Sequence, residues 1–164
     1  MSDIDPKALI VRAADMKGSP EESFVHPLNP SSQIYGTSLG KKVGLKRVGI
    51  SYVTVPAGKE SFAFHAHHAD EEWVFILAGR GIAEIADEAI EVAPGDFVGY
   101  PTGVPHNMRN PHDEDLLYLM GGESNTIEIA DFPRHNKRLV RMENRAELHP
   151  LDTAEPFWSA EEDR

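Results

Sequence analysis

Short runs of β-favouring residues, separated by Gly, Pro and Asp, fill the chain from Lys46 to Met120. Apolar and polar positions alternate within several of these runs, and lengths of about four to eight residues are typical of strands. The connections are too short to hold crossover helices, so the pattern predicts an antiparallel barrel or sandwich and not a βαβ sheet. The predicted strands cover residues 46–55, 61–68, 72–78, 81–86, 88–92, 97–100, 104–109 and 115–121.

Gly and Pro place the turns and divide this strand-rich core, residues 46–121, from its flanks. A tight turn is predicted at Asp87–Glu88, and two more where Pro and Gly fall together after residues 93 and 100. The N-terminal arm, residues 1–45, is interrupted by Pro and Gly and is expected to be loop-like. The C-terminal extension, residues 122–164, is expected to be irregular, with at most a short helix near 139–148 and a loosely ordered tail from 150.

Composition and charge narrow the classes of protein that this chain can represent. Its 164 residues are expected to form one domain. There is no apolar run long enough to span a bilayer, and the acidic N-terminus does not resemble a signal peptide. The chain has no Cys, which fits a reducing cytoplasm. A formal net charge of −11 argues against nucleic acid and anionic membranes as partners.

Candidate metal-ligating residues occur in three of the predicted strands. His65 and His67 stand two positions apart, so alternation along the strand points both imidazoles to the same face. Glu72 opens the next strand, and His106 lies in the strand 104–109. Three neutral imidazoles and one carboxylate would leave positions open on an octahedral divalent ion. An exchangeable position of this kind distinguishes catalytic metal sites from closed structural ones.

The spacing of these residues resembles the two sequence motifs of the cupin superfamily. In the first motif, the gap between the leading Gly and the His-x-His pair is one residue longer than usual, and the remaining spacing fits. The second motif is matched at every fixed position. The first is carried by Gly58, His65, His67, Glu72 and Gly79, and the second by Gly95, Pro101, Gly103, His106 and Asn110.

The resemblance implies a fold and a ligand set. The fold would be all-β: a conical double-stranded β-helix, the cupin jelly-roll barrel, with irregular N- and C-terminal extensions. One divalent ion, whether Zn, Mn, Fe, Ni or Co, would be held by His65, His67, Glu72 and His106. The flanks, including Gly121-Gly122-Glu123 and Asp131-Phe132-Pro133, resemble small single-domain cupins, some of them labelled sugar-phosphate-isomerase-like.

Three residues near the first motif compete with this assignment. Asp70 and Glu71 are rival carboxylates, and Glu71 fits a shorter variant of the gap after His67. Only Glu72 also keeps the six-residue distance to Gly79, which favours Glu72 as the ligand. His68 faces the other side of its strand and is expected to be exposed or to contact a ligand from outside.

One serine and four further histidines are not expected to have a catalytic or ligand role. Ser38 stands in a G-x-S-x-G stretch, but a nucleophile elbow requires an α/β sheet with a helix after the serine, and a β-like run follows here. Four further histidines lie in loop-like segments and are expected to be solvated: His26, His112, His135 and His149.

We expect a metal-dependent enzyme that acts on a small polar or anionic metabolite, such as a sugar-phosphate isomerase or epimerase. The alternatives are an iron-dependent dioxygenase, which the same ligands can serve, and a non-enzymatic small-molecule sensor. An isomerase needs an acid–base group beside the ion, and the candidates are Tyr52, Tyr118 or a histidine outside the ligand set. Arg47 and Arg109 are candidates for binding phosphate.

An apolar stripe on the third predicted strand indicates a further contact. Trp73, Phe75 and Leu77 share the face opposite Glu72 and would point outward. A stripe of this kind needs cover, either from the N-terminal arm or from a second subunit. We therefore expect a homodimer.

Overall fold

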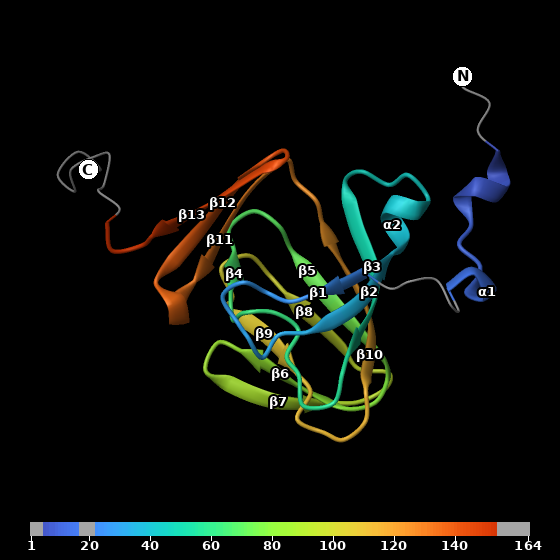
Figure 1. The fold of residues 1–164 in the computed structure, drawn as a ribbon, viewed down its shortest axis with the longest axis horizontal. Helices are drawn as coiled ribbons and strands as arrows, with labels where there is room; N and C mark the ends of the chain where they lie inside the picture. The colour runs from blue at the N-terminus through green and yellow to red at the C-terminus, as the bar shows by residue number, and fades with distance from the viewer. Residues whose placement is uncertain (1–4, 17–21, 154–164) are drawn as a thin grey trace.

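The computed structural model describes residues 5–16 and 22–153, and strands dominate the described part (Figure 1). Its helical segments are short: α1 (Ala13–Met16), α2 (Leu39–Lys42) and two 3₁₀ turns at Pro6–Leu9 and Pro133–His135. The strands are β1 (Glu22–Phe24), β2 (Ile34–Ser38), β3 (Val48–Val55), β4 (Ala66–His67), β5 (Glu72–Ala78), β6 (Gly81–Ile85), β7 (Glu88–Val92), β8 (Phe97–Tyr100), β9 (His106–Arg109), β10 (Leu116–Glu123), β11 (Ile127–Phe132), β12 (Lys137–Met142) and β13 (Arg145–Pro150).

The strands form three antiparallel sheets, and β11, β12 and β13 lie to one side of the barrel that the other strands form (Figure 1). The largest sheet has the order β1-β2-β3-β10-β5-β8, and the others have the orders β7-β6-β9 and β13-β12-β11-β4. The two smaller sheets meet where His65 pairs with His106: each backbone N–H donates to the other carbonyl, at 3.0 and 2.7 Å. This bridge joins the strands of the first motif directly to those of the second.

The interior is filled by the inward-facing side chains of the largest sheet and its neighbours. Val74 and Ile76 on β5 point inward with Glu72, as the alternation predicts, and both are almost fully buried. Gly121 on β10 allows Trp73 of β5 to lie against the backbone, because a Cβ at Gly121 would stand 2.3 Å from the indole ring. The buried cluster comprises Val53, Val55, Val74, Ile76, Ala83, Val92, Val98, Tyr100, Met108, Leu116 and Tyr118.

The flanks contain more regular structure than the sequence indicates. In the N-terminal arm, β1 and β2 extend the largest sheet, and α2 packs on β3. The prediction of a short helix near 139–148 is wrong. Strands β12 and β13 form a hairpin there, and Glu143 in its turn has φ 53°. The turn between β6 and β7 lies at Ala86–Asp87, one residue earlier than predicted, with Ala86 at φ 51°. Of the loosely ordered tail expected from residue 150, the segment 154–164 lies outside the described residues.

The hairpin forms because β11 presents a free edge beside the barrel. Strand β12 pairs with β11 along its whole length, from Phe132 opposite Lys137 to Ile127 opposite Met142. Leu139 packs against a second buried cluster formed by Ala63, Ala130 and Phe132. Helix-favouring composition between 139 and 148 is therefore outweighed by the backbone pairing that the neighbouring strand offers.

The outward stripe on β5 has the predicted direction. Phe75 and Leu77 are 37% and 39% exposed, and Phe97 on the adjacent edge strand β8 is 65% exposed. Strands β1 and β2 lie at the opposite edge of the same sheet, so they do not cover this stripe. The homodimer stays a prediction. No helix among the described residues is long and apolar enough to cross a membrane.

Candidate metal centre

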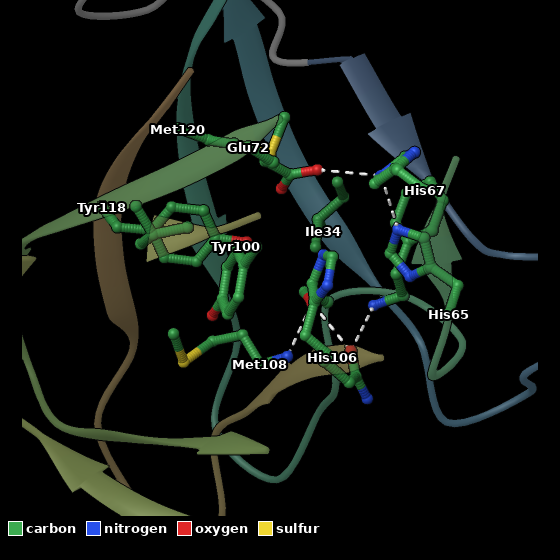
Figure 2. Close-up of a pocket in the computed structure, with 13 residues that line it drawn as sticks. Ile34, His65, His67, Glu72, Tyr100, His106, Met108, Tyr118 and Met120 are labelled. Carbon is green, nitrogen blue, oxygen red and sulfur yellow. Dashed lines mark hydrogen bonds and ion pairs between the residues drawn. The ribbon is translucent and has the colours of Figure 1, made fainter. Parts of the chain in front are cut away.

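The structure brings together the four side chains that the motifs single out. His65 and His67 come from β4 and the residue before it, Glu72 from the start of β5, and His106 from the start of β9. Each offers one ligand atom, and these atoms lie within 4.8 Å of one another (Figure 2). Among the residues that the structure describes, this group of His and carboxylate side chains could hold a metal ion.

Hydrogen bonds orient all three imidazoles in the same sense. His65 Nδ1 lies 2.8 Å from the carbonyl oxygen of Ala63, and His106 Nδ1 lies 2.9 Å from that of Val104. His67 Nδ1 lies 3.2 Å from Glu128 Oε1. Since these oxygens can only accept, each Nδ1 carries the proton and each Nε2 presents a lone pair. Ligating histidines in metal sites show this same outer hydrogen bonding.

The three Nε2 atoms and the Glu72 carboxylate lie close to one another. His65 Nε2 and His67 Nε2 are 3.0 Å apart, and His67 Nε2 is 3.3 Å from Glu72 Oε2. The Nε2 atom of His106 is buried without a hydrogen-bond partner. Acceptors facing one another in a buried place are unfavourable unless a cation lies between them. The donor set therefore fits a divalent ion that accepts nitrogen and oxygen ligands.

The protonation states also suit metal binding. Burial, together with the neighbouring His106 and His67, lowers the pKa of His65 to about 3. Burial also lowers the pKa of His106. Burial disfavours the charged form of Glu72, but His67 and the other imidazoles stabilise the carboxylate and lower its pKa. Burial alone would lower the pKa of His67, but Glu72 and Glu128 outweigh it and raise that pKa. A metal ion would therefore compete mainly with one proton on His67.

The two rival carboxylates, Asp70 and Glu71, do not point into the four-residue group. Asp70 is buried, but its Oδ1 accepts from Asn125 Nδ2 at 2.7 Å and its Oδ2 lies 3.3 Å from Arg141 Nη2. Glu71 is exposed and lies outside the four-residue group. His68 points away, as expected, and pairs with Asp131 at 2.9 Å on the surface. Geometry thus favours Glu72 over both neighbours.

Glu128 is a site residue that the sequence did not reveal. It lies on β11, is 2% exposed, and contacts His67 from the side away from the cavity. Its two oxygens also accept from the backbone N–H groups of His68 and Asp70, at 3.2 and 2.9 Å. Glu128 shares the buried face of β11 with Ala130 and Phe132, in a segment where the sequence predicts irregular structure.

Tyr100 is a second site residue that the sequence left out. Its ring stacks on His106 with centroids 3.9 Å apart and planes 6° from parallel. Its hydroxyl is buried without a hydrogen-bond partner, and burial raises its pKa. Alternation on β8 offered a signal, because Tyr100 shares the inward face of Val98 and directly precedes the second-motif Pro101.

The other tyrosines and arginines singled out in the sequence have different positions. Tyr118 lines the cavity, and burial raises its pKa, whereas Tyr52 is not among the cavity residues. Arg47 is exposed, and Arg109 Nε lies 3.3 Å from Glu84 Oε1. Neither arginine lines the cavity.

One of the four loop histidines departs clearly from its expected solvation. His26 is 6% exposed, because the segment after β1 folds onto the barrel and places its ring 4.6 Å from Phe62 and 5.2 Å from Phe132. His112 is partly buried, whereas His135 and His149 are exposed. Ser38 does stand between a strand and the short α2, but its sheet is antiparallel, so it is not a nucleophile elbow.

A cavity of about 150 Å³ adjoins the four-residue group (Figure 2). It lies between the strands of the largest sheet and β9, so a molecule inside it would contact both motifs. Its lining consists of Ile34, Ser61, Phe62, His65, His67, Glu72, Val74, Tyr100, His106, Asn107, Met108, Tyr118 and Met120.

Comparisons with known proteins agree with this architecture. Residues 51–121 match the family described as Cupin domain. A protein of Acidithiobacillus ferrooxidans that is proposed to be a sugar phosphate isomerase has a crystal structure 33% identical in sequence, with a TM-score of 0.90. That match covers 94% of this chain and 100% of the other.

Two further matches are more distant. A cupin-superfamily protein of Silicibacter pomeroyi, named as a sugar phosphate isomerase, is 20% identical with a TM-score of 0.74, covering 86% of this chain and 90% of that one; it supports the fold alone. An uncharacterised protein of Methanocaldococcus jannaschii is 34% identical over 76 residues, and the match spans 46% of this chain and 59% of that relative. The fold, both motifs and the match along the whole A. ferrooxidans chain lead to one conclusion: the chain belongs to the cupin superfamily.

Proposed function

We propose that the chain is a metal-dependent enzyme whose four-residue group holds one divalent ion beside a substrate cavity. The observation that carries the proposal is the shared orientation of the three imidazoles. Each Nδ1 is engaged by an acceptor, which leaves three Nε2 lone pairs and the Glu72 carboxylate facing one buried point. A closed structural site would not need the adjoining cavity.

The residues of the chain would divide the work as follows. A divalent ion, when bound, supplies Lewis acidity or, if it is redox-active, oxygen chemistry. His65, His67 and His106 would hold it through Nε2, and Glu72 would supply the one anionic ligand. Tyr100 has the buried hydroxyl without a partner, so it is the group available to hydrogen-bond a substrate oxygen. The barrel wall would limit the access of water to the reacting atoms.

The first candidate reaction is an isomerisation of a small hydroxy-carbonyl compound, of the kind that sugar phosphate isomerases catalyse. Similarity to the A. ferrooxidans protein along nearly the whole chain supports it. Tyr100 or Tyr118 would serve as the proton donor, because both line the cavity and burial raises the pKa of each phenol, which keeps the proton on the hydroxyl at neutral pH.

The second candidate is an iron-dependent dioxygenase, and the composition of the cavity wall favours it. Among the described residues that line the cavity, the only His, Asp or Glu side chains are the four proposed ligands, so no separate carboxylate or imidazole is left to act as a base. An isomerase must remove a proton from carbon and needs a base for that step, whereas the oxygen chemistry that an iron ion held by these four residues would supply places less demand on a separate protein base.

Two assays on the same preparations decide between the candidates. The protein is freed of metal with a chelator and reloaded with Zn²⁺, Mn²⁺ or Fe²⁺, and metal content is measured before each assay. Interconversion of hydroxy-carbonyl compounds by the Zn²⁺ or Mn²⁺ form supports the isomerase. Oxygen uptake only by the Fe²⁺ form supports the dioxygenase. Failure of every metal to bind in near-equimolar amount contradicts the proposal as a whole.

A further inference from the structure

Most of the side chains that line the cavity, apart from the four-residue group, are apolar. Ile34 from β2, Val74 from β5 and Met120 from β10 belong to the largest sheet, and Phe62 and Met108 complete the apolar lining. Ile34, Met108 and Met120 can be followed in Figure 2. A molecule whose polar end reaches the ion would therefore place its other end against hydrocarbon side chains.

The polar side chains of the wall are already hydrogen-bonded to one another. Ser61 Oγ donates to Asn107 Oδ1 at 3.0 Å and accepts from the backbone N–H of Met108 at 3.3 Å. Asn107 Nδ2 donates to Glu60 Oε2 at 3.1 Å. These bonds hold the wall together and leave Ser61 and Asn107 few free donors for a ligand. The Tyr100 hydroxyl is the exception, since it is buried and without a partner.

The cavity lining contains no cationic Lys or Arg side chain among the described residues. The partly buried arginines elsewhere on the barrel pair with carboxylates: Arg109 with Glu84, Arg138 with Asp131 and Arg141 with Asp70. Proteins bind phosphate through Arg, Lys or clustered backbone N–H groups, because a buried dianion without such partners is strongly disfavoured.

The size of the cavity sets a second limit. A volume of about 150 Å³ matches the engineered apolar cavity that accepts a single benzene molecule. An ion in the four-residue group would occupy part of the polar end. The remaining space suits a group of a few carbon atoms.

We infer that the cavity selects a small substrate that binds the ion through neighbouring oxygen atoms and has an uncharged, largely apolar remainder, as in a branched short-chain 2-oxo acid. This inference rests on the proposed function, because the ion supplies the positive charge for the oxygen end. It departs from a phosphorylated sugar, for which the wall offers no second cationic partner.

Binding to the Zn²⁺-loaded protein, measured by isothermal titration calorimetry, tests the inference with three probes. These are 4-methyl-2-oxopentanoate, pyruvate and ribose 5-phosphate. Each methylene that enters an apolar wall strengthens binding by roughly fourfold. The branched oxo acid should therefore bind at least tenfold more tightly than pyruvate and more tightly than ribose 5-phosphate. Equal or tighter binding of ribose 5-phosphate, or no binding of the branched oxo acid, overturns the inference.

A pair of variants separates this result from the proposed metal site. Met120→Trp fills the apolar end and should weaken binding of the branched oxo acid at least tenfold while zinc content stays near one per chain. Met142→Trp is the control, because Met142 is 48% exposed on β12 and does not line the cavity. Unchanged binding in folded Met120→Trp overturns the inference. Absence of zinc from the wild-type protein would instead contradict the proposed function. If Met120→Trp does not fold, the comparison of the three probes on the wild-type protein still tests the inference.

Discussion

Replacing Glu128 with Gln tests whether the C-terminal strand β11 orients the candidate metal ligand His67. The carboxylate receives three N–H groups: His67 Nδ1 at 3.2 Å, the His68 backbone at 3.2 Å and the Asp70 backbone at 2.9 Å. Gln keeps the shape but replaces one acceptor oxygen with an NH₂ group. Whichever way the amide turns, that group faces at least one of the three donors.

The expected losses of folding free energy and of zinc affinity follow from these three donors. If the amide oxygen keeps its bonds to His67 and His68, the Asp70 N–H loses its partner, which costs about 1–3 kcal/mol of folding free energy. His67 also loses a charged acceptor, and charge-assisted bonds are roughly twice as strong as neutral ones. Outer partners of metal ligands are worth about 10–100-fold in affinity, or about 1.4–2.7 kcal/mol. We expect Glu128→Gln to weaken zinc binding within that range.

The assay is competition for Zn²⁺ with a chromophoric chelator, accompanied by urea unfolding of the metal-free protein. Glu123→Gln is the matched control: Glu123 is exposed, accepts from the Glu71 backbone at 3.2 Å and is not among the partners of His67. The control should keep wild-type zinc affinity. A zinc Kd for folded Glu128→Gln within twofold of wild type would show that His67 does not depend on β11, and the reasoning would fail.

Three further predictions concern the ligand set, the packing of β10 and the response to acid. Glu72→Gln should lower zinc content, because the ion would lose its one anionic ligand, and Glu71→Gln should not; the reverse pattern in elemental analysis would show that the wrong carboxylate was chosen. Gly121→Ala should cost about 1–3 kcal/mol in urea unfolding, because its Cβ would collide with Trp73, whereas Gly99→Ala, with its nearest contact at 3.7 Å, should be close to neutral. The metal-free protein should lose stability as pH falls from about 6.5 towards 4, because burial lowers the pKa of His65 to about 3 and the unfolded chain then binds a proton that the folded chain excludes; a stability that rises over this window would contradict that sign.

Local pattern explains part of the arrangement of the candidate ligands. The two-residue spacing of His65 and His67 implies a common face, whereas the choice of Glu72 over Glu71 rests on the spacing of the motif that the chain resembles. That His106 meets the His65–His67 pair depends on the pairing of distant strands. The sequence reached it only through the resemblance of its second motif, and the bridge between His65 and His106 accounts for it physically.

Long-range contacts explain what the sequence could not supply. Glu128 lies 61 residues after His67, so no periodicity within one strand connects them. His26 is buried because the segment after β1 folds onto Phe62, a contact between residues far apart in the chain. The hairpin of β12 and β13 stands in place of the expected helix because β12 pairs with β11 along its whole length. In each case tertiary pairing outweighed the local preference of the segment.

Metal content measured together with X-ray absorption tests the central claim most directly. The wild-type protein, stripped and then equilibrated with Zn²⁺, should retain about one ion per chain, with a spectrum that shows several imidazole nitrogens, and His106→Ala should lose most of that metal while remaining a folded β-protein by circular dichroism. Wild-type protein that retains no zinc, or His106→Ala that retains as much zinc as wild type, would contradict the account.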